Sequence, residues 1–296
     1  MPAAPVLAPL DLNGDLDPAL SVAADLAERS GASLHLLNAR PTPPTYLPPS
    51  DPDAGYRAQV EVVVDRTLGP GSCAALSPTI HVAHAAHPAT ATLDLARELN
   101  PQVIVLGTHG RRGYQRFVHG SVAEKVVRDA RWPTLAVPMQ ADYWLPGPDH
   151  PVVVATDLSE YGAAALRAGA EHAERYGAQL VVVHSVAPMP QNIGLFAPWD
   201  LAESETDIPP GTSEAVYEQM GAVGVEGADL IVRRVEAPEL IDRVAREREA
   251  GCIVMGTHGR RGLGRALLGS VTAAVLRGAS CSVLAVRVGE ESEADE

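Results

Sequence analysis

The heptapeptide GTHGRRG occurs twice in this chain of 296 residues, at positions 107–113 and 256–262. Each copy continues into a longer pattern, G-x2-G-x9-G-S, with the same spacing in both places. Glycine has no Cβ and tolerates positive φ, so successive backbone N–H groups can point at an anion. The pattern therefore predicts a phosphate-binding loop in each copy. The residues that set the spacing are Gly107, Gly110, Gly120 and Ser121 in the first copy and Gly256, Gly259, Gly269 and Ser270 in the second.

The side chains around these glycines suit the same ligand. Arg111 and Arg260 each open a pair of arginines that could neutralise a polyphosphate. The serine that ends each pattern is expected to begin a helix, whose N-terminal amides and dipole favour an anion. The alternative is structural, because a glycine-rich turn can be only a turn and Ser121 with Glu124 would form an ordinary capping box. Two copies in the same context favour phosphate binding.

The duplication extends well beyond the glycine pattern. The segment that starts with PVLAPLD at position 5 parallels the one that starts with PVVVATD at position 151, which places Asp11 opposite Asp157. Apolar runs alternate with helical patterns in both halves, as is typical of a parallel sheet covered on both faces. We therefore expect an α/β fold with two tandem doubly wound domains, each a five-stranded parallel sheet. Their expected bounds are residues 1–140 and 150–288, followed by an acidic tail at residues 289–296.

The elements expected in each half follow one order. A strand, a helix and a second strand precede a Pro-rich insertion that is expected to be a loop, residues 41–55 in the first half. A helix, a third strand, another helix, a fourth strand, the glycine pattern, a last helix and a last strand follow. The expected strands are residues 6–11, 33–39, 79–85, 103–107 and 133–139, then 152–157, 179–185, 230–237, 252–256 and 282–288.

Composition excludes several classes of protein. The formal net charge of −14 disfavours a large surface laid against nucleic acid or an anionic membrane. The three cysteines are far apart and outside any CxxC pattern, so neither a disulfide framework nor a zinc site is expected. The sequence contains no run of about 18 uncharged apolar residues, the length that a membrane-spanning helix needs. A cytoplasmic protein with no metal ligands of its own is expected.

The first-strand Asp, the G-x2-G-x9-G-S pattern and the last strand together resemble the universal stress protein family, in two copies that cover nearly the whole chain. The resemblance is specific, because neither the P-loop GxxxxGK[ST] nor the GxGxxG of dinucleotide enzymes is present. It implies an adenine-nucleotide-hydrolase-like fold. It also implies binding of ATP or a related adenine nucleotide, with Mg²⁺ as a companion ion, and a role as a stress-response module.

The resemblance assigns roles by position. In the first half, Pro9 and Asp11 stand on the adenosine side, Ala39 lines the adenine and Leu106 lies beside the ribose. In the second half, Asp157, Ser185 and Met255 take these roles, and Ala155 replaces the family's proline. The glycine pattern is expected to hold ribose and phosphates in both. The halves differ again where Asn38 replaces the His that the second half retains as His184, so equal occupancy of the two sites is not implied.

Two residue types leave alternatives open. Asp11 and Asp157 could cap the helix that follows, a common role for an Asp after a strand, and we favour a dual role, because a capping carboxylate at this edge also faces the ligand crevice. His109 and His258 lie inside the glycine pattern and could contact phosphate or hydrogen-bond the turn. His81 and His84 are expected on opposite faces of a strand, which argues against a metal site.

No catalytic residues are assigned. Neither a G-x-S-x-G elbow nor a positioned base is detectable, so turnover is expected to be slow if there is any. The alternatives are a nucleotide-independent interaction protein and a slow ATPase. Because the last strand of each half is apolar and would leave an unpaired edge, the halves are expected to pair as a pseudo-dimer within the chain, as family members do between chains. A homodimer is the other arrangement.

Overall fold

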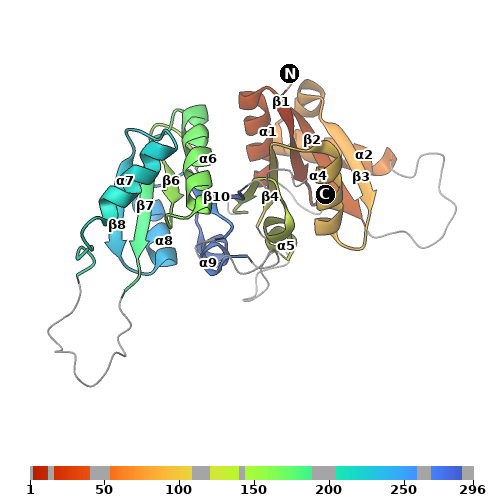
Figure 1. Cartoon of the computed structure of the whole chain (residues 1–296). Helices are drawn as coiled ribbons and strands as arrows, with labels where there is room; N and C mark the ends of the chain where they lie inside the picture. Colours follow the sequence, from red (N-terminus) through yellow and green to blue (C-terminus); the bar gives the residue numbers. More distant parts are fainter. Residues whose placement is uncertain are drawn as a thin grey trace, which may run out of the picture. The chain divides into compact units, whose positions relative to one another are not determined.

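The computed structural model describes residues 3–12, 17–40, 54–108, 121–139, 144–188, 204–258 and 268–288. The chain divides into two compact units, one built mainly from residues 1–143 and the other mainly from residues 144–296, with residues 282–285 counted in the first. Figure 1 shows parallel strands between helices in each unit. The expected α/β fold is confirmed.

Among the described residues, the first half has five parallel strands in the order β3-β2-β1-β4-β5. Its described helices lie between these strands in sequence, two of them, α2 and α3, between β2 and β3. The strands are β1 (Ala3–Pro9), β2 (Ala32–Arg40), β3 (Thr79–His84), β4 (Val103–Gly107) and β5 (Thr134–Val137). The helices are α1 (Pro18–Ser30), α2 (Ala54–Leu68), α3 (Ser72–Leu76), α4 (Pro88–Leu99) and α5 (Ser121–Asp129).

The second unit repeats this order, with β9-β6-β7-β8 side by side and parallel. Its strands are β6 (Val152–Ala155), β7 (Leu180–Val186), β8 (Asp229–Arg234) and β9 (Cys252–Gly256), and the last strand of the chain is β10 (Ser282–Val286). The helices are α6 (Glu160–Tyr176), α7 (Thr212–Ala222), α8 (Ala237–Glu247) and α9 (Ser270–Gly278). All ten strands predicted from the sequence are therefore present.

Both faces of each sheet are buried, as continuous apolar strands require. In the first unit, Leu7, Leu37 and Ile104 belong to a core that also takes in residues of α4 and α5. Their strand neighbours Val6 and Leu36 are equally inaccessible and point to the other face, where α1 and α2 pack together.

Candidate functional site

In the first half, the predicted site residues converge at the carboxyl ends of β1, β2 and β4. Pro9 pairs with Leu37 in the parallel register, and the backbone N–H of Leu10 donates to the Leu37 carbonyl at 2.8 Å. The register that pairs Leu7 with Ile104 places Pro9 level with Leu106. Asp11, Ala39 and Gly107 follow these positions directly. The exposed Asp11 therefore lies at the same edge as the start of the glycine pattern.

The second half brings the equivalent residues together in the same way. Ala155 pairs with Val183 on one side and with Met255 on the other. Asp157 therefore comes just beyond the end of β6, beside Ser185 and Gly256 in the last residues of β7 and β9. β6 lies between β7 and β9, so the strand order reverses beside it, and its carboxyl edge is a topological switch point, where open α/β sheets bind their ligands.

Both serines of the glycine pattern begin a helix, as predicted. Ser121 is the first residue of α5 and Ser270 the first residue of α9. In the second half, the N–H of Gly269 donates to the Thr257 carbonyl at 2.9 Å, and the Thr272 hydroxyl donates to the Gly256 carbonyl at 2.8 Å. These bonds tie the N-terminus of α9 to the end of β9, so that its unsatisfied N–H groups belong to the same edge.

Five of the predicted site residues lie outside the described residues: Gly110, Arg111, Gly120, Gly259 and Arg260. His109 does as well. Their part in a phosphate loop stays a prediction. His258 is described, and its Nδ1 lies 3.0 Å from the Thr257 hydroxyl, while its ring lies 5.4 Å from that of Tyr161. This contact favours the structural alternative for His258, namely that it holds the turn.

Packing requires glycine at two of the three described glycines of the pattern, Gly256 and Gly269. A Cβ on Gly107 would stand 2.5 Å from Sδ of Met139. One on Gly256 would stand 2.7 Å from Cβ of Tyr161, in the first turn of α6, and one on Gly269 would lie 3.0 Å from the Thr257 carbonyl oxygen. Because real Cβ contacts are longer, a side chain at Gly256 or Gly269 would displace α6 or α9 from the strand ends, whereas at Gly107 the flexible Met139 side chain could move aside.

The alternative that Asp11 and Asp157 cap the next helix is wrong. Asp17 caps α1, accepting from the N–H groups of Ala19 and Leu20 at 3.0 and 3.3 Å. Ser159 caps α6, and Asp157 supports it by accepting from the Ser159 N–H at 3.0 Å and from its hydroxyl at 2.5 Å. α1 begins only at Pro18 and α6 at Glu160, so each helix starts beyond the position that the strand-end Asp could cap.

The ends of the second strands differ between the halves. His184 is buried with its Nδ1 2.9 Å from the Thr156 carbonyl oxygen, a bond that only an Nδ1–H tautomer can make. Asn38, at the equivalent position, is equally buried and donates through Nδ2 to the Leu10 carbonyl at 3.4 Å, while its Oδ1 has no hydrogen-bond partner. Ser185 also donates to the Val235 carbonyl at 2.5 Å, a bond that Ala39 cannot make.

The sequence analysis missed a polar network that fixes the loop after β6. The Thr156 hydroxyl donates to Oε1 of Gln219 at 2.6 Å and accepts the N–H of Leu158 at 3.1 Å. Gln219 on α7 in turn donates to the Ser159 carbonyl at 2.9 Å. Leu158 has a φ of 66°, a left-handed conformation that these bonds hold in place. No motif marks Gln219, so its role follows only from where α7 packs.

The described residues contain neither a cluster of metal ligands nor a membrane-spanning helix. No group of three His, Cys, Asp or Glu side chains there could hold a metal ion. No helix among the same residues is long and apolar enough to cross a bilayer. His35 and His81 form a pair with Nδ1 and Nε2 2.9 Å apart, but they lie nearer the amino ends of β2 and β3.

Comparison with known proteins gives the context of this site. A family model described as the universal stress protein family matches residues 3–138 and again residues 150–287. Universal stress protein Rv2005c of Mycobacterium tuberculosis is 32% identical over 197 residues, which cover 63% of this chain and 62% of that relative. The match thus spans less than two thirds of the relative. A universal stress protein of Thermus aquaticus is 31% identical over 136 residues, 46% of this chain and 97% of its own length.

Among solved structures, a functionally unknown protein from Pseudomonas aeruginosa aligns with 96% of this chain and 92% of its own, with a TM-score of 0.70 at 18% identity. That likeness concerns the fold alone. Two solved universal stress proteins, one in complex with cAMP and one from Archaeoglobus fulgidus in complex with dAMP, each cover 46% of this chain. Their TM-scores are 0.35 and 0.32, too low to support an inference about this chain's ligand.

Proposed function

This chain belongs to the universal stress protein family, and on that premise we propose that it binds an adenine nucleotide, ATP in the first place, at the carboxyl edge of at least one half. Binding would make it a stress-response module whose partners read the nucleotide state. Its domains would be residues 1–140 and 150–288, and it would act in the cytoplasm.

The observation that supports this proposal most directly is the convergence of unlike residues at one edge. Asp157, Ser185, Met255 and the N-terminus of α9 come from four separate stretches of sequence, yet each follows or adjoins the carboxyl end of a neighbouring strand. An acid, a lining for a base and a helix N-terminus are what a nucleoside phosphate requires. The first half repeats the set with Asp11, Ala39, Leu106 and α5.

The residues present fit such a ligand. Asp11 or Asp157 would take the adenosine side, and Ala39 or Ser185 would line the adenine. Leu106 or Met255 would lie beside the ribose. The phosphates would lie against the N–H groups that begin α5 or α9, neutralised by Arg111 or Arg260 and by a bound Mg²⁺. Asp157 already accepts two hydrogen bonds from Ser159, so it is poorly placed to act as a base, and hydrolysis should be slow.

Isothermal titration with ATP, together with chromatography of nucleotide released from the purified protein, tests the proposal. Binding should weaken in Gly110→Val or Gly259→Val, because a β-branched side chain blocks close approach of a phosphate to the backbone. Comparing the two single variants assigns the nucleotide to a half. Gly221→Val, on the open surface of α7, is the control for a glycine outside the pattern. If the protein binds no adenine nucleotide and releases none, the proposal fails.

A further inference from the structure

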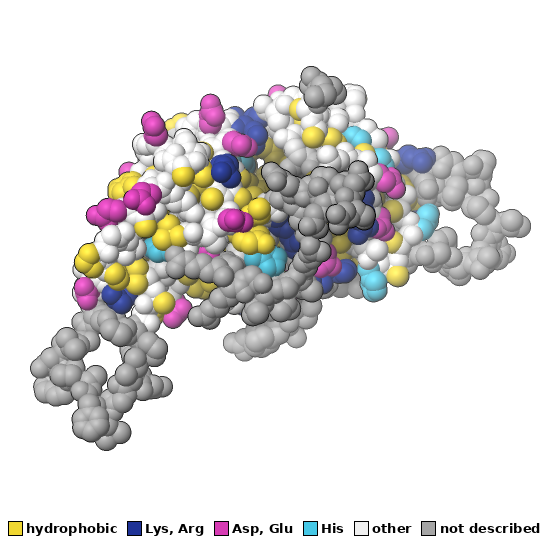
Figure 2. Space-filling model, viewed as in Figure 1, with side chains coloured by type: hydrophobic (Ala, Val, Ile, Leu, Met, Phe, Trp, Pro, Cys, Tyr) yellow, Lys and Arg dark blue, Asp and Glu magenta, His cyan; other side chains and the backbone are white. Residues whose placement is uncertain are grey.

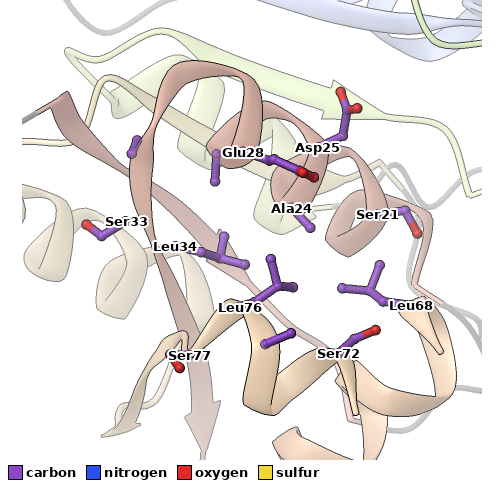
Figure 3. A pocket seen from close by; sticks show the side chains of 13 residues that line it. Ser21, Ala24, Asp25, Glu28, Ser33, Leu34, Leu68, Ser72, Leu76 and Ser77 are labelled. Atoms are coloured by element: carbon purple, nitrogen blue, oxygen red, sulfur yellow. The ribbon is translucent and has the colours of Figure 1, made fainter. Parts of the chain in front are cut away.

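A pocket of about 700 Å³ lies in the first unit, away from the carboxyl edge of the sheet. It is bounded by the second half of α1, the last residue of α2, the short helix α3 and the start of β2, and Figure 3 shows the side chains around it. The lining residues are Ser21, Ala24, Asp25, Ala27, Glu28, Ala32, Ser33, Leu34, Leu68, Ser72, Ala75, Leu76 and Ser77. Its volume is within the range of small-molecule sites.

One wall of this pocket has no counterpart in the second half. The connection from α2 to β3 contains α3, whereas residues 223–228, which join α7 to β8, are fewer and form no helix. The N–H of Cys73 donates to Oδ1 of Asp65 at 2.8 Å, which fastens α3 to α2. Gly71 and Ser77 bracket α3 with φ values of 83° and 45°. This wall is thus present in the first half and has no counterpart in residues 223–228 of the second.

The electrostatics of the pocket favour a cation. None of its lining residues is basic. The last turns of α1 and α2 border it, and the C-terminal end of a helix carries partial negative charge, although each of these turns also holds an arginine, Arg29 and Arg66. The Asp25 carboxylate is neutralised by the Arg29 guanidinium at 3.0 Å, and Figure 3 shows it pointing away from the central leucines. Glu28 therefore supplies the net charge of the lining.

The apolar and serine side chains of the pocket indicate which kind of cation would fit it. Leu34, Leu68 and Leu76 lie together at the centre in Figure 3, and alanines complete the apolar part. No aromatic side chain is among the lining residues, so the cage that selects quaternary ammonium groups is missing. Serine hydroxyls can accept hydrogen bonds from an ammonium group, which carries three donors.

We propose that this pocket binds a small aliphatic ammonium compound, with its alkyl chain on the leucines and its ammonium group between the Glu28 carboxylate and the serine hydroxyls. The site is separate from the proposed nucleotide site, which lies at the opposite ends of the strands. Binding here would give the first half a second input that the second half does not have.

Titration of the full chain, labelled with ¹⁵N, tests this with three probes that share one alkyl chain: butylammonium, butanol and butyrate. Butylammonium should produce saturable amide shifts at Ala24, Ser33 and Ala75 at millimolar concentrations. Butanol should bind more weakly, and butyrate should not bind there. Equal shifts with butyrate, or no saturable shift with butylammonium, would overturn the proposal. Because no nucleotide is present, the result is independent of ATP binding.

Two variants and one matched control locate the site. Glu28→Gln should weaken butylammonium binding by about two- to fivefold, the range for one exposed charge contact. Glu174→Gln changes the equivalent residue of α6 and should leave the affinity unchanged. Ala75→Phe should abolish binding by filling the pocket. If Glu174→Gln weakens binding as much as Glu28→Gln, the ammonium responds only to the overall negative charge, and the proposal is wrong.

Discussion

At the scale of single residues, the two halves place different polar side chains at the same buried position, and these side chains differ in their hydrogen bonding. His184 and Asn38 occupy equivalent positions and are 7% and 6% exposed, so neither can turn to water for a hydrogen bond. Nδ1 of His184 forms a hydrogen bond with the Thr156 carbonyl oxygen at 2.9 Å, whereas Oδ1 of Asn38 has no hydrogen-bond partner. A buried acceptor without a partner costs free energy of folding.

Replacing each of these residues by leucine should therefore have unequal effects. His184→Leu removes the donor to a buried carbonyl and should lower the free energy of unfolding by about 1–3 kcal/mol. Asn38→Leu removes an unsatisfied acceptor together with one long hydrogen bond and should change it by less than about 1 kcal/mol. Urea unfolding monitored by circular dichroism measures both. An equal loss in the two variants would contradict this account.

The histidine pair of the first sheet predicts a dependence of stability on pH. His35 and His81 lie with Nδ1 and Nε2 2.9 Å apart. Burial lowers the pKa of both from 6.5, the charge of His81 lowers the pKa of His35 further, and Glu98 partly opposes the lowering at His81. Because the folded pKa values are below the unfolded ones, protonation favours the unfolded chain. The contribution of the neutral pair to the free energy of unfolding is fully present above pH 6.5, the unfolded pKa, and it declines as the pH falls below that value.

The urea midpoint should therefore fall between about pH 7.5 and about pH 5.5. The fall should be smaller in the double variant His35→Gln, His81→Gln, in which neither residue can be protonated. His84→Gln changes an exposed residue at the end of the same strand and should keep the full dependence. A double variant as sensitive to pH as the parent would show that other groups cause the effect.

At the scale of elements, the sequence predicted what depends on periodicity and missed what depends on packing. The strand VIVLG was predicted at its observed bounds, because a β-branched apolar run of this length between turn signals is too short for a buried helix and favours a buried strand. α3 was missed, since five residues, SCAAL, carry no helical period and owe their conformation to the Asp65 contact. The position of the site at the carboxyl edge of the sheet could be predicted from the alternation of strands and helices. The hydrogen bond between Thr156 and Gln219 could not, because it joins residues 63 apart in the sequence.

The packing of α6 on β6 gives a prediction at this scale. A Cβ on Gly169 would stand 2.2 Å from Cγ2 of Val154, so helix and strand touch only because this residue is glycine. Gly169→Ala should lower the free energy of unfolding by about 1–3 kcal/mol through overpacking. Gly221→Ala, in α7 with nothing within 4 Å of the added Cβ, should change it by no more than about 1 kcal/mol. Thermal unfolding that ranks the two variants in the opposite order would contradict this packing argument.

At the scale of the whole molecule, charge and duplication act together. The chain carries a formal net charge of −14, and Figure 2 shows acidic side chains scattered over one face with basic ones between them. Two such chains repel each other at low ionic strength. β5 and β10, the last strands of their halves, have every residue buried, whereas an unpaired apolar strand edge would promote association. We propose that the halves satisfy these edges within one chain.

Light scattering after gel filtration should then give the mass of one chain, 31.1 kDa, at low salt and also at about 1 M salt, where the Debye length is about 3 Å. The measurement at high salt distinguishes two reasons why the protein would be a monomer. If repulsion alone kept chains apart, screening it would expose the strand edges and the mass would double. If the edges are satisfied internally, screening leaves the mass unchanged. A mass that doubles at high salt would therefore contradict internal pairing and point to a homodimer.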